Sequence, residues 1–261
     1  MMKQVIKLAL VAIVGMTLTS CLSVNLGSGD VDTTPTQVQQ INQDVAMQPF
    51  NEVGIAGAFK IVYEQGPQYS VRVEASEQAL KEMTVYVKDN ELRIRKAVKK
   101  PTVSFKDVKV YVTSPDLKKI ELAGSGMFAA SNPVKAGKDL SVEIAGSGKV
   151  LLAALTSQET RLDIAGSGNI EIGNLTINDV KAEIAGSGEV NLGTLICKEL
   201  NVDIAGSGNV NCSNINADEV HVDIAGSGDV NLKGTVKHHT KDIAGSGKVV
   251  IEELAPVSTN N

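Results

Sequence analysis

Apolar and polar residues alternate through the second half of the chain, and a short glycine-rich motif interrupts the alternation at regular intervals. The motif Ala-Gly-Ser-Gly occurs seven times. Its copies begin at Ala123, Ala145, Ala165, Ala185, Ala205, Ala225 and Ala244, so that successive copies lie 22, 20, 20, 20, 20 and 19 residues apart. A fixed period near 20 residues is typical of a solenoid, in which each repeat packs against its neighbours.

The residues on both sides of each motif predict β-strands. Val142-Glu143-Ile144 precede one copy, and Val150 and Leu152 follow it; alternation with a period of two buries one face of a strand. Three columns of mostly aliphatic residues recur at equivalent positions. They are Ile144, Ile164, Ile184, Ile204, Ile224 and Ile243; Val150, Ile170, Val190, Val210, Val230 and Val249; and Leu152, Ile172, Leu192, Cys212, Leu232 and Ile251.

Twenty residues are too few for a unit of strand, helix and strand, so each coil must place its strands beside those of the previous coil. We therefore predict an all-β fold: a right-handed single-stranded parallel β-helix of about 20 residues per coil over residues 117–255, with a C-terminal tail at 256–261. In the last coil Lys241 stands where Val222 stands one coil earlier. Together with Pro256, this polar replacement favours an end to the stacking.

Residues 49–116 lack the repeat and predict an N-terminal antiparallel β portion that caps the β-helix. Their alternating segments, separated by turn residues, predict two hairpins. The hairpin strands are expected at 59–63 with 69–73 and at 84–87 with 92–95. Residues 76–82 predict one short helix. A cap at this end would cover the unpaired backbone groups of the first coil.

Residues 1–21 predict an export signal, with a basic start and an apolar stretch over residues 8–18 that is too short to span a bilayer. The stretch ends at Leu18-Thr19-Ser20-Cys21, which resembles a bacterial lipobox. Cys21 is therefore the predicted lipid attachment site, and the alternative is a simple secretory peptide whose cysteine is incidental. The polar residues 22–48 predict a flexible tether.

The composition of the chain disfavours nucleic-acid binding and an aromatic glycan-binding groove. Lys and Arg total 25 against 30 for Asp and Glu, a net charge of −5, so a chain this acidic is a poor candidate for nucleic-acid binding. Aromatic residues are 3% of the chain and Trp is absent. A groove for glycans would normally offer aromatic platforms, and residues 129–261 contain none.

Four segments of the first half, together with the glycine corners, carry a family resemblance. They are Val53–Ile61, Tyr69–Val73, Leu92–Ile94 and Val110–Leu117. Over about residues 50–250 the chain resembles the auto-transporter adhesins with a head GIN domain, which are lipoproteins and secreted proteins of the Bacteroidetes. The resemblance implies a β-helical, non-enzymatic protein of the cell envelope.

An acidic residue stands immediately before each Ile-Ala-Gly-Ser-Gly. The candidate surface ladder consists of Glu143, Asp163, Glu183, Asp203, Asp223 and Asp242, and Glu121 holds the equivalent position in the first coil. Acids stacked about 4.8 Å apart would repel by roughly 1 kcal/mol per pair. A Ca²⁺ ion bridging adjacent coils would offset this repulsion. We favour the alternative, hydrogen bonds from N–H groups of the following glycine corner aided by Arg161 and Lys181, because the Gly-Gly-x-Gly-x-Asp calcium signature is absent.

Other polar positions favour structural roles. Asn191, Asn211 and Asn231 predict an amide ladder, and Asn169 and Asn209 a second one. His238 and His239 are adjacent on a strand and so point to opposite faces, which disfavours a shared metal. Cys197 and Cys212 fall on inward positions and predict buried free thiols, with a disulfide between coils as the alternative. No motif copy has the residues of a phosphate-binding loop or a catalytic serine.

We therefore predict no catalytic, cofactor or metal-binding residues, because catalysis needs one singular constellation and these acids recur identically. The predicted function is a non-catalytic cell-envelope lipoprotein whose β-helix displays a binding surface, as in an adhesin. Its predicted partners are the membrane, through Cys21, and a protein or glycan. Outer-membrane attachment is expected, with the periplasmic face and the cell surface both open. The alternatives are a polysaccharide-active β-helix enzyme and a structural or stress-related periplasmic lipoprotein.

Overall fold

The computed structural model describes residues 40–45, 48–97, 99 and 101–253. All of them belong to one compact unit, Val38–Asn261. The predicted leader, the predicted lipid attachment at Cys21 and the C-terminal tail lie outside the described residues, as do residues 22–39 and 46–47 of the predicted tether. Residues 40–45, which were predicted as flexible tether, instead form a strand. Within the described residues, no helix is long and apolar enough to cross a membrane.

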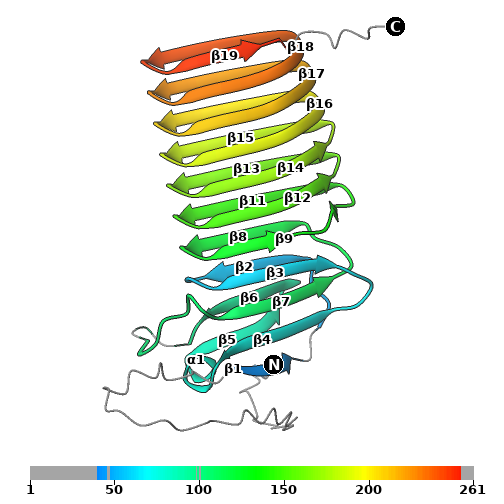
Figure 1. The fold of residues 1–261 in the computed structure, drawn as a ribbon, viewed down its shortest axis with the longest axis vertical. Helices are drawn as coiled ribbons and strands as arrows, with labels where there is room; N and C mark the ends of the chain where they lie inside the picture. Colours follow the sequence, from blue (N-terminus) through cyan, green and yellow to red (C-terminus); the bar gives the residue numbers. More distant parts are fainter. Residues whose placement is uncertain (1–39, 46–47, 98, 100, 254–261) are drawn as a thin grey trace, which may run out of the picture. The chain divides into compact units, whose positions relative to one another are not determined.

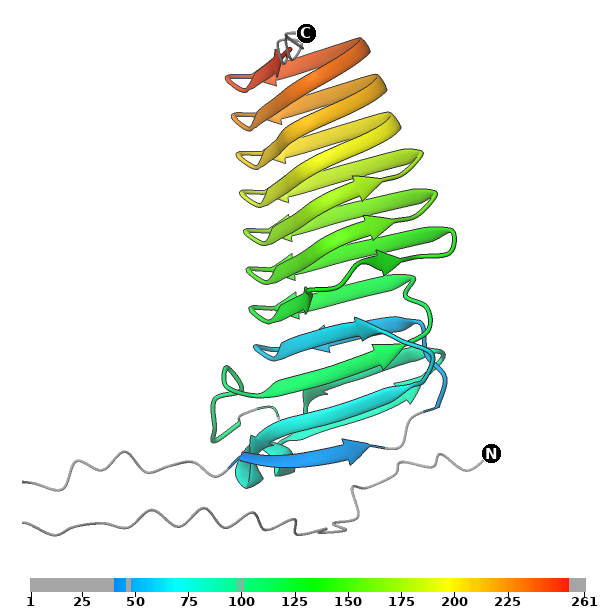
Figure 2. The same ribbon diagram turned by 45° about the vertical axis from the view of Figure 1, so that its right-hand side comes forward.

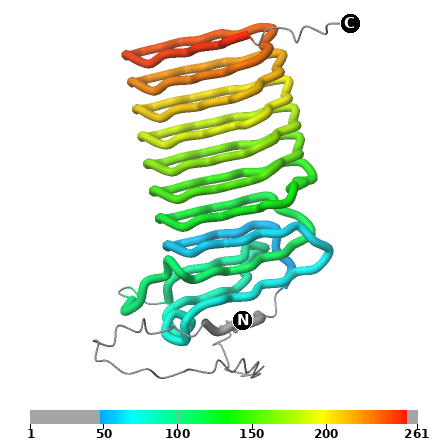
Figure 3. Tube along the Cα trace, viewed as in Figure 1, coloured from blue at the N-terminus to red at the C-terminus, as the bar shows by residue number. Residues whose placement is uncertain are grey.

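The second half of the chain forms a parallel β-solenoid, as predicted (Figures 1 and 3). Each coil contributes an extended segment before the glycine corner and one after it, and in the later coils the two segments between successive corners join into one long strand. Equivalent segments of successive coils pair in parallel. The strands are β8 (Lys119–Gly124), β9 (Met127–Ala130), β10 (Val134–Lys135), β11 (Asp139–Gly146), β12 (Lys149–Thr156), β13 (Glu159–Gly166), β14 (Asn169–Thr176), β15 (Asp179–Gly186), β16 (Glu189–Gly206), β17 (Asn209–Gly226), β18 (Asp229–Gly245) and β19 (Lys248–Glu252).

The predicted period sets the register between coils. Ile144 lies beside Ile164, and Ile164 beside Ile184, so each residue meets its equivalent 20 positions away. The inward column that starts at Val150 is completely buried from Val150 to Val230, at 0% exposure. The 19-residue spacing of the last coil is absorbed by a register shift between Cys212 and Ile215, opposite β18.

The solenoid begins earlier than the glycine motif (Figure 2). Strand β2 (Glu52–Ala56) pairs in parallel with β6 (Glu91–Lys96) on one side and with β8 on the other. Strand β3 (Lys60–Gln65) pairs in parallel with β7 (Lys109–Ser114) and with β9. The chain therefore builds two levels of the stack before the first Ala-Gly-Ser-Gly corner.

The antiparallel portion consists of three strands and a short helix at this end. Strand β4 (Ser70–Ser76) pairs with β7, β5 (Met83–Lys88) pairs with β6, and β1 (Gln40–Val45) pairs with β4. Helix α1 (Glu77–Lys81) begins after the N-cap Ser76, whose side chain accepts a hydrogen bond from the Ala79 N–H. The predicted cap and short helix are thus confirmed.

One predicted hairpin is confirmed and the other is wrong. Strands β5 and β6 form the hairpin, with Asp89 and Asn90 at φ 55° and 63°, the left-handed conformations that a two-residue turn requires. Strands β3 and β4 do not pair, because β7 lies between them. Tyr63 of β3 is held in this arrangement by its hydroxyl, 3.0 Å from Ser114 Oγ of β7, and by its ring, stacked 5.5 Å from Phe128 of β9.

Candidate functional site

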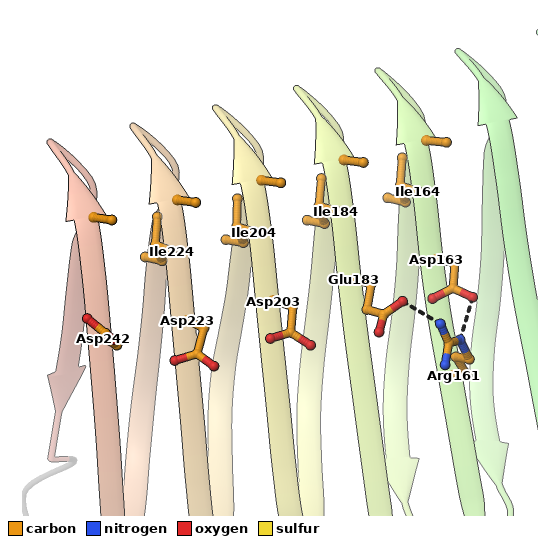
Figure 4. Close-up of a pocket in the computed structure, with 15 residues that line it drawn as sticks. Arg161, Asp163, Ile164, Glu183, Ile184, Asp203, Ile204, Asp223, Ile224 and Asp242 are labelled. Carbon is orange, nitrogen blue, oxygen red and sulfur yellow. Dashed lines mark hydrogen bonds and ion pairs between the residues drawn. The ribbon is translucent and has the colours of Figure 1, made fainter.

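The acid ladder lies in the strands that precede the glycine corners (Figure 4). Glu143, Asp163 and Glu183 stand in register on β11, β13 and β15, and Asp203, Asp223 and Asp242 continue the column on β16, β17 and β18. The neighbours of each acid along its strand point inward in the first five of these coils. The carboxylates are therefore directed to the outside of the solenoid, as predicted from the alternation.

Cations form ion pairs with the acids in the first part of the ladder. Lys119, Arg161 and Lys181 each stand two positions before an acid, on the same face of the strand, and each reaches the acid of its own coil and that of the following one. The Nζ of Lys119 lies 3.2 Å from Glu121 and 3.0 Å from Glu143; Arg161 pairs with Asp163 at 2.7 Å and with Glu183; the Nζ of Lys181 lies 2.6 Å from Glu183 and 3.4 Å from Asp203. These bridges offset repulsion between stacked carboxylates.

The last part of the ladder lacks such cations. The residues two positions before the acids become Asn201, His221 and Thr240, and His221 contacts Thr240 and Glu219 rather than an acid of the ladder. Among the described residues, Asp223 and Asp242 have no ion pair. Negative charge therefore accumulates toward the C-terminal end of the ladder.

Burial also differs along the ladder. Desolvation raises the pKa of Asp163 above its usual range, outweighing the hydrogen bond from Arg161 that lowers it. Its Oδ1 atom is buried and has no hydrogen-bond partner within the part of the chain that the structure describes. The pKa of Glu183 is instead lowered, chiefly by the hydrogen bond from Lys181.

The expected hydrogen bonds from the glycine corners to the acids are not formed, so that prediction is wrong. The Ser167 N–H donates to the carbonyl of Gly146 at 2.8 Å, and the Ser187 N–H donates to the carbonyl of Gly166 at 2.8 Å. Because the corners stack in register, the serine N–H of a corner donates to the first-glycine carbonyl of the previous corner. The other half of the prediction, help from Arg161 and Lys181, is confirmed. The described residues contain no group of three or more His, Cys, Asp or Glu side chains placed to hold a metal ion.

A shallow open groove follows the ladder. Its floor is the alanine of each corner, and these alanines are exposed. The alanines in the groove are Ala165, Ala185, Ala205, Ala225 and Ala244. The groove has a volume of about 700 Å³ and is edged by the acids from Asp163 to Asp242. It offers an apolar strip beside a row of carboxylates, repeated at each coil from Ala165 to Ala244.

The face after the corners carries the predicted amide ladder. Asn231 donates to Asn211 at 3.0 Å, and Asn211 donates to Asn191 at 2.9 Å. Asn169 and Asn209 do not form a second ladder, because Glu189 stands between them in their column. Asn169 instead donates to Glu189 at 3.4 Å, and the Asn209 side chain accepts from the Asp229 N–H at 3.0 Å.

The remaining candidates have structural surroundings. Cys197 and Cys212 are free and buried, as predicted, and desolvation raises the pKa of Cys197 to about 12. His238 and His239 are exposed on the last coil. The change from cations to neutral residues before the later acids was not singled out in the sequence, although the residue two positions upstream of each acid carries that signal.

Known proteins support the assignment of the fold. The chain is 21% identical to a crystal structure titled putative adhesin from Parabacteroides distasonis ATCC 8503, with a TM-score of 0.71, covering 82% of this chain and 98% of that one. A putative adhesin from Bacteroides fragilis NCTC 9343 is 24% identical, with a TM-score of 0.60 and coverage of 83% and 98%. A protein titled putative lipid binding protein, also from Parabacteroides distasonis, is 20% identical, with a TM-score of 0.66 and coverage of 83% and 98%.

No curated protein matches the chain. The family model described as "Putative auto-transporter adhesin, head GIN domain" matches residues 49–213 and 204–259. The two matches together include the N-terminal cap and the solenoid. They cover about the same residues as the family resemblance seen in the sequence. The chain therefore belongs to the family described as "Putative auto-transporter adhesin, head GIN domain".

Proposed function

We propose that this protein is a non-catalytic binding module of the cell envelope, held to a membrane by a lipid on Cys21, and that its solenoid presents an adhesive surface to a partner. The support is the family, whose description names an adhesin, and the leader ending in Leu18-Thr19-Ser20-Cys21. Several acyl chains on one cysteine would hold the protein firmly, since each buried methylene adds about 0.8 kcal/mol.

The groove beside the acid ladder is the observation that carries the proposal. It runs over successive coils with the same chemistry at each step, a carboxylate beside an exposed alanine. With about 4.8 Å between coils, such a surface suits an extended partner with repeating groups better than a compact small molecule. Because Asp223 and Asp242 lack ion pairs within the described residues, we expect a cationic segment of a protein or glycan to bind at that end.

The last three acids of the ladder do not resemble a glycosidase centre. Glycoside hydrolysis assigns different tasks to two carboxyl groups, which requires different environments for them. Asp203, Asp223 and Asp242 instead occupy the same position of consecutive coils, each beside an exposed alanine. This equivalence favours repeated binding contacts over acid–base catalysis.

The lipid in this proposal is the covalent anchor and not a molecule carried in the solenoid. The inward side chains fill the coils; Val150, Ile170 and Val190, for example, are 0% exposed. Protein interiors packed in this way have no space for an acyl chain.

Binding is tested with two sets of variants that remove equal charge. Asp203→Asn, Asp223→Asn and Asp242→Asn are combined in one chain, and Glu159→Gln, Glu199→Gln and Glu219→Gln in the control. The control residues are exposed on β13, β16 and β17 and do not line the groove. The probes are immobilised oligolysine and the amine-bearing polysaccharide chitosan. We expect the first set to lose most binding and the control set to retain it. Equal loss in both sets would show only net-charge attraction and would contradict a site in the groove.

Location is tested separately, on cells that express the full chain. Cys21→Ala should move the protein out of the membrane fraction. Proteinase K added to intact cells should cut the native protein together with a known surface protein. An untouched solenoid beside a digested surface control would rule out display on the cell exterior.

A further inference from the structure

Part of a strand edge in the last coil is not covered by any described strand. Strand β19 pairs with β18 only from Asp229 to Lys233. From Gly234 onward, β18 pairs with β17 on one side, where Gly234 lies beside Ile215 of β17. No described strand lies on the other side of this part of β18. This edge is at the end of the solenoid opposite β1, in the red and orange part of Figure 1. Its N–H and C=O groups are available to another strand.

At this end of the solenoid, the inward apolar side chains are only partly buried. Val236, Ile243, Val249 and Ile251 are partly buried, whereas the residues that precede them in the same columns are buried. Those buried equivalents are Ala217, Ile224, Val230 and Leu232, each at 3% exposure or less. A free strand edge beside an uncovered apolar lining is the usual starting point for association between copies of a chain.

Two basic side chains interrupt this lining. His239 lies beside Val220 and Lys241 beside Val222, which are 0% and 1% exposed. His239 and Lys241 therefore occupy inward positions but are exposed, since none of the described strands covers them. Inward-pointing charge on an edge strand is a recognised device against edge-to-edge pairing.

We propose that Lys241, with His239, keeps the C-terminal edge from pairing with the same edge of a second copy of this chain. The two edges can meet in antiparallel pairing about a two-fold axis, and the apolar linings join only when inward residues oppose inward residues. Such pairing brings His239 and Lys241 of the second copy close to His239 and Lys241 of the first. Directly opposed side chains lie about 4.5–5.5 Å apart at Cβ, so like charges would be brought together and withdrawn from water.

The C-terminal tail offers a competing explanation for the block. Eight residues, 254–261, follow Glu253, and Pro256 among them cannot donate a ladder hydrogen bond. If that tail rather than the basic pair blocked the edge, deleting it would be sufficient to cause association. The two explanations are therefore distinguishable by experiment.

The central test compares two double variants of identical composition. In one, His239→Val and Lys241→Val restore the apolar column. In the control, His238→Val and Lys248→Val make the same replacements at outward positions of the last coil. The chains start at residue 22, which retains the whole compact unit 38–261, and their mass is measured by light scattering after size-exclusion chromatography and by sedimentation velocity.

We expect the native chain and the control to be monomeric and the inward variant to dimerise, with a dissociation constant lowered on the order of 100-fold or more. A monomeric inward variant that retains its β-sheet circular dichroism would overturn the proposal. Association of the native chain, or association to the same extent in the control, would overturn it as well. Association on deleting 254–261 with Lys241 intact would assign the block to the tail instead.

A charge-reversed chain keeps the test independent of the solubility of the inward variant. Lys241→Glu should be monomeric alone, because it places like charges at the interface again. Mixed with the native chain it should form a heterodimer that weakens as salt is raised, visible by native mass spectrometry. Failure of the mixture to associate would contradict charge as the block.

Discussion

Replacing one corner glycine should destabilise the whole stack, because the corner packs directly on the corner beneath it. Gly166 has φ +126°, a conformation that costs a residue with a side chain about 1–3 kcal/mol. A Cβ on Gly166 would lie 2.6 Å from the carbonyl oxygen of Gly146. That oxygen accepts the 2.8 Å hydrogen bond from the Ser167 N–H, so moving it sacrifices about 1 kcal/mol more. We expect Gly166→Ala to lower the free energy of unfolding by about 2–4 kcal/mol.

Gly137 provides the matched control. It is exposed, a Cβ there would meet no atom within 4 Å, and it is not among the glycines of positive φ. Gly137→Ala should therefore change the free energy of unfolding by no more than about 0.5 kcal/mol, with stabilisation as the expected sign, because alanine restricts the unfolded chain.

Urea titration of the three chains measures the difference. Circular dichroism follows all the strands, whereas tyrosine fluorescence follows the capped end, since the four tyrosines lie between residues 63 and 111. Coincident transitions permit a two-state analysis; separated transitions would place the loss in the solenoid and leave the cap unchanged. If Gly166→Ala and Gly137→Ala unfolded at the same urea concentration, the argument from corner stacking would be refuted.

Three further changes test the side-chain ladders and the core. Arg161→Gln should cost no more than about 1 kcal/mol, since the guanidinium is half exposed, and the cost should fade in high salt in urea titrations. Asn211→Ala should cost about 1–2 kcal/mol by breaking both amide contacts, whereas Asn214→Ala, at an exposed position of the same strand, should be neutral in the same assay. Burial raises the pKa of Cys197 from 9.0 to about 12, so the contribution of the buried neutral thiol to the free energy of unfolding is complete below pH 9 and is lost between pH 9 and 12. Iodoacetamide should label Cys197 and Cys212 only after unfolding, and rapid labelling of the native chain at pH 8 would contradict their burial.

The solenoid could be predicted because its rule is local and repeated. A glycine corner, alternation on both sides of it and a period near 20 residues together determine which residues meet, as in the pairing of Ile144 with Ile164. Every coil adds the same evidence, so an error in one coil is corrected by the others. The buried columns follow directly, because register and alternation leave each side chain only one face to occupy.

The capped end could be predicted only in part, because alternation identifies a strand without identifying its partner. The turn residues between β3 and β4 suggested a hairpin, but both edges of β3 are taken by β7 and β9. The contacts that select this arrangement join residues far apart in sequence, such as Tyr63 with Ser114 and Phe128. Long-range packing therefore overrides the local turn signal.

The acid ladder illustrates why polar chemistry in a solenoid must be considered between coils. The hydrogen bonds expected from the corners were assigned within one coil, whereas the corner N–H groups pair with the coil before. The cations also act between coils, because Lys181 pairs with Glu183 in its own coil and with Asp203 in the next one. Replacing the residue two positions before one acid therefore alters the surroundings of two acids. With Asn201, His221 and Thr240 at the later positions, Asp223 and Asp242 are left without a cation among the described residues. The same backbone repeat thus produces a stretch of ion-paired acids and a stretch of acids without cations, and a cationic partner would distinguish the two by charge alone.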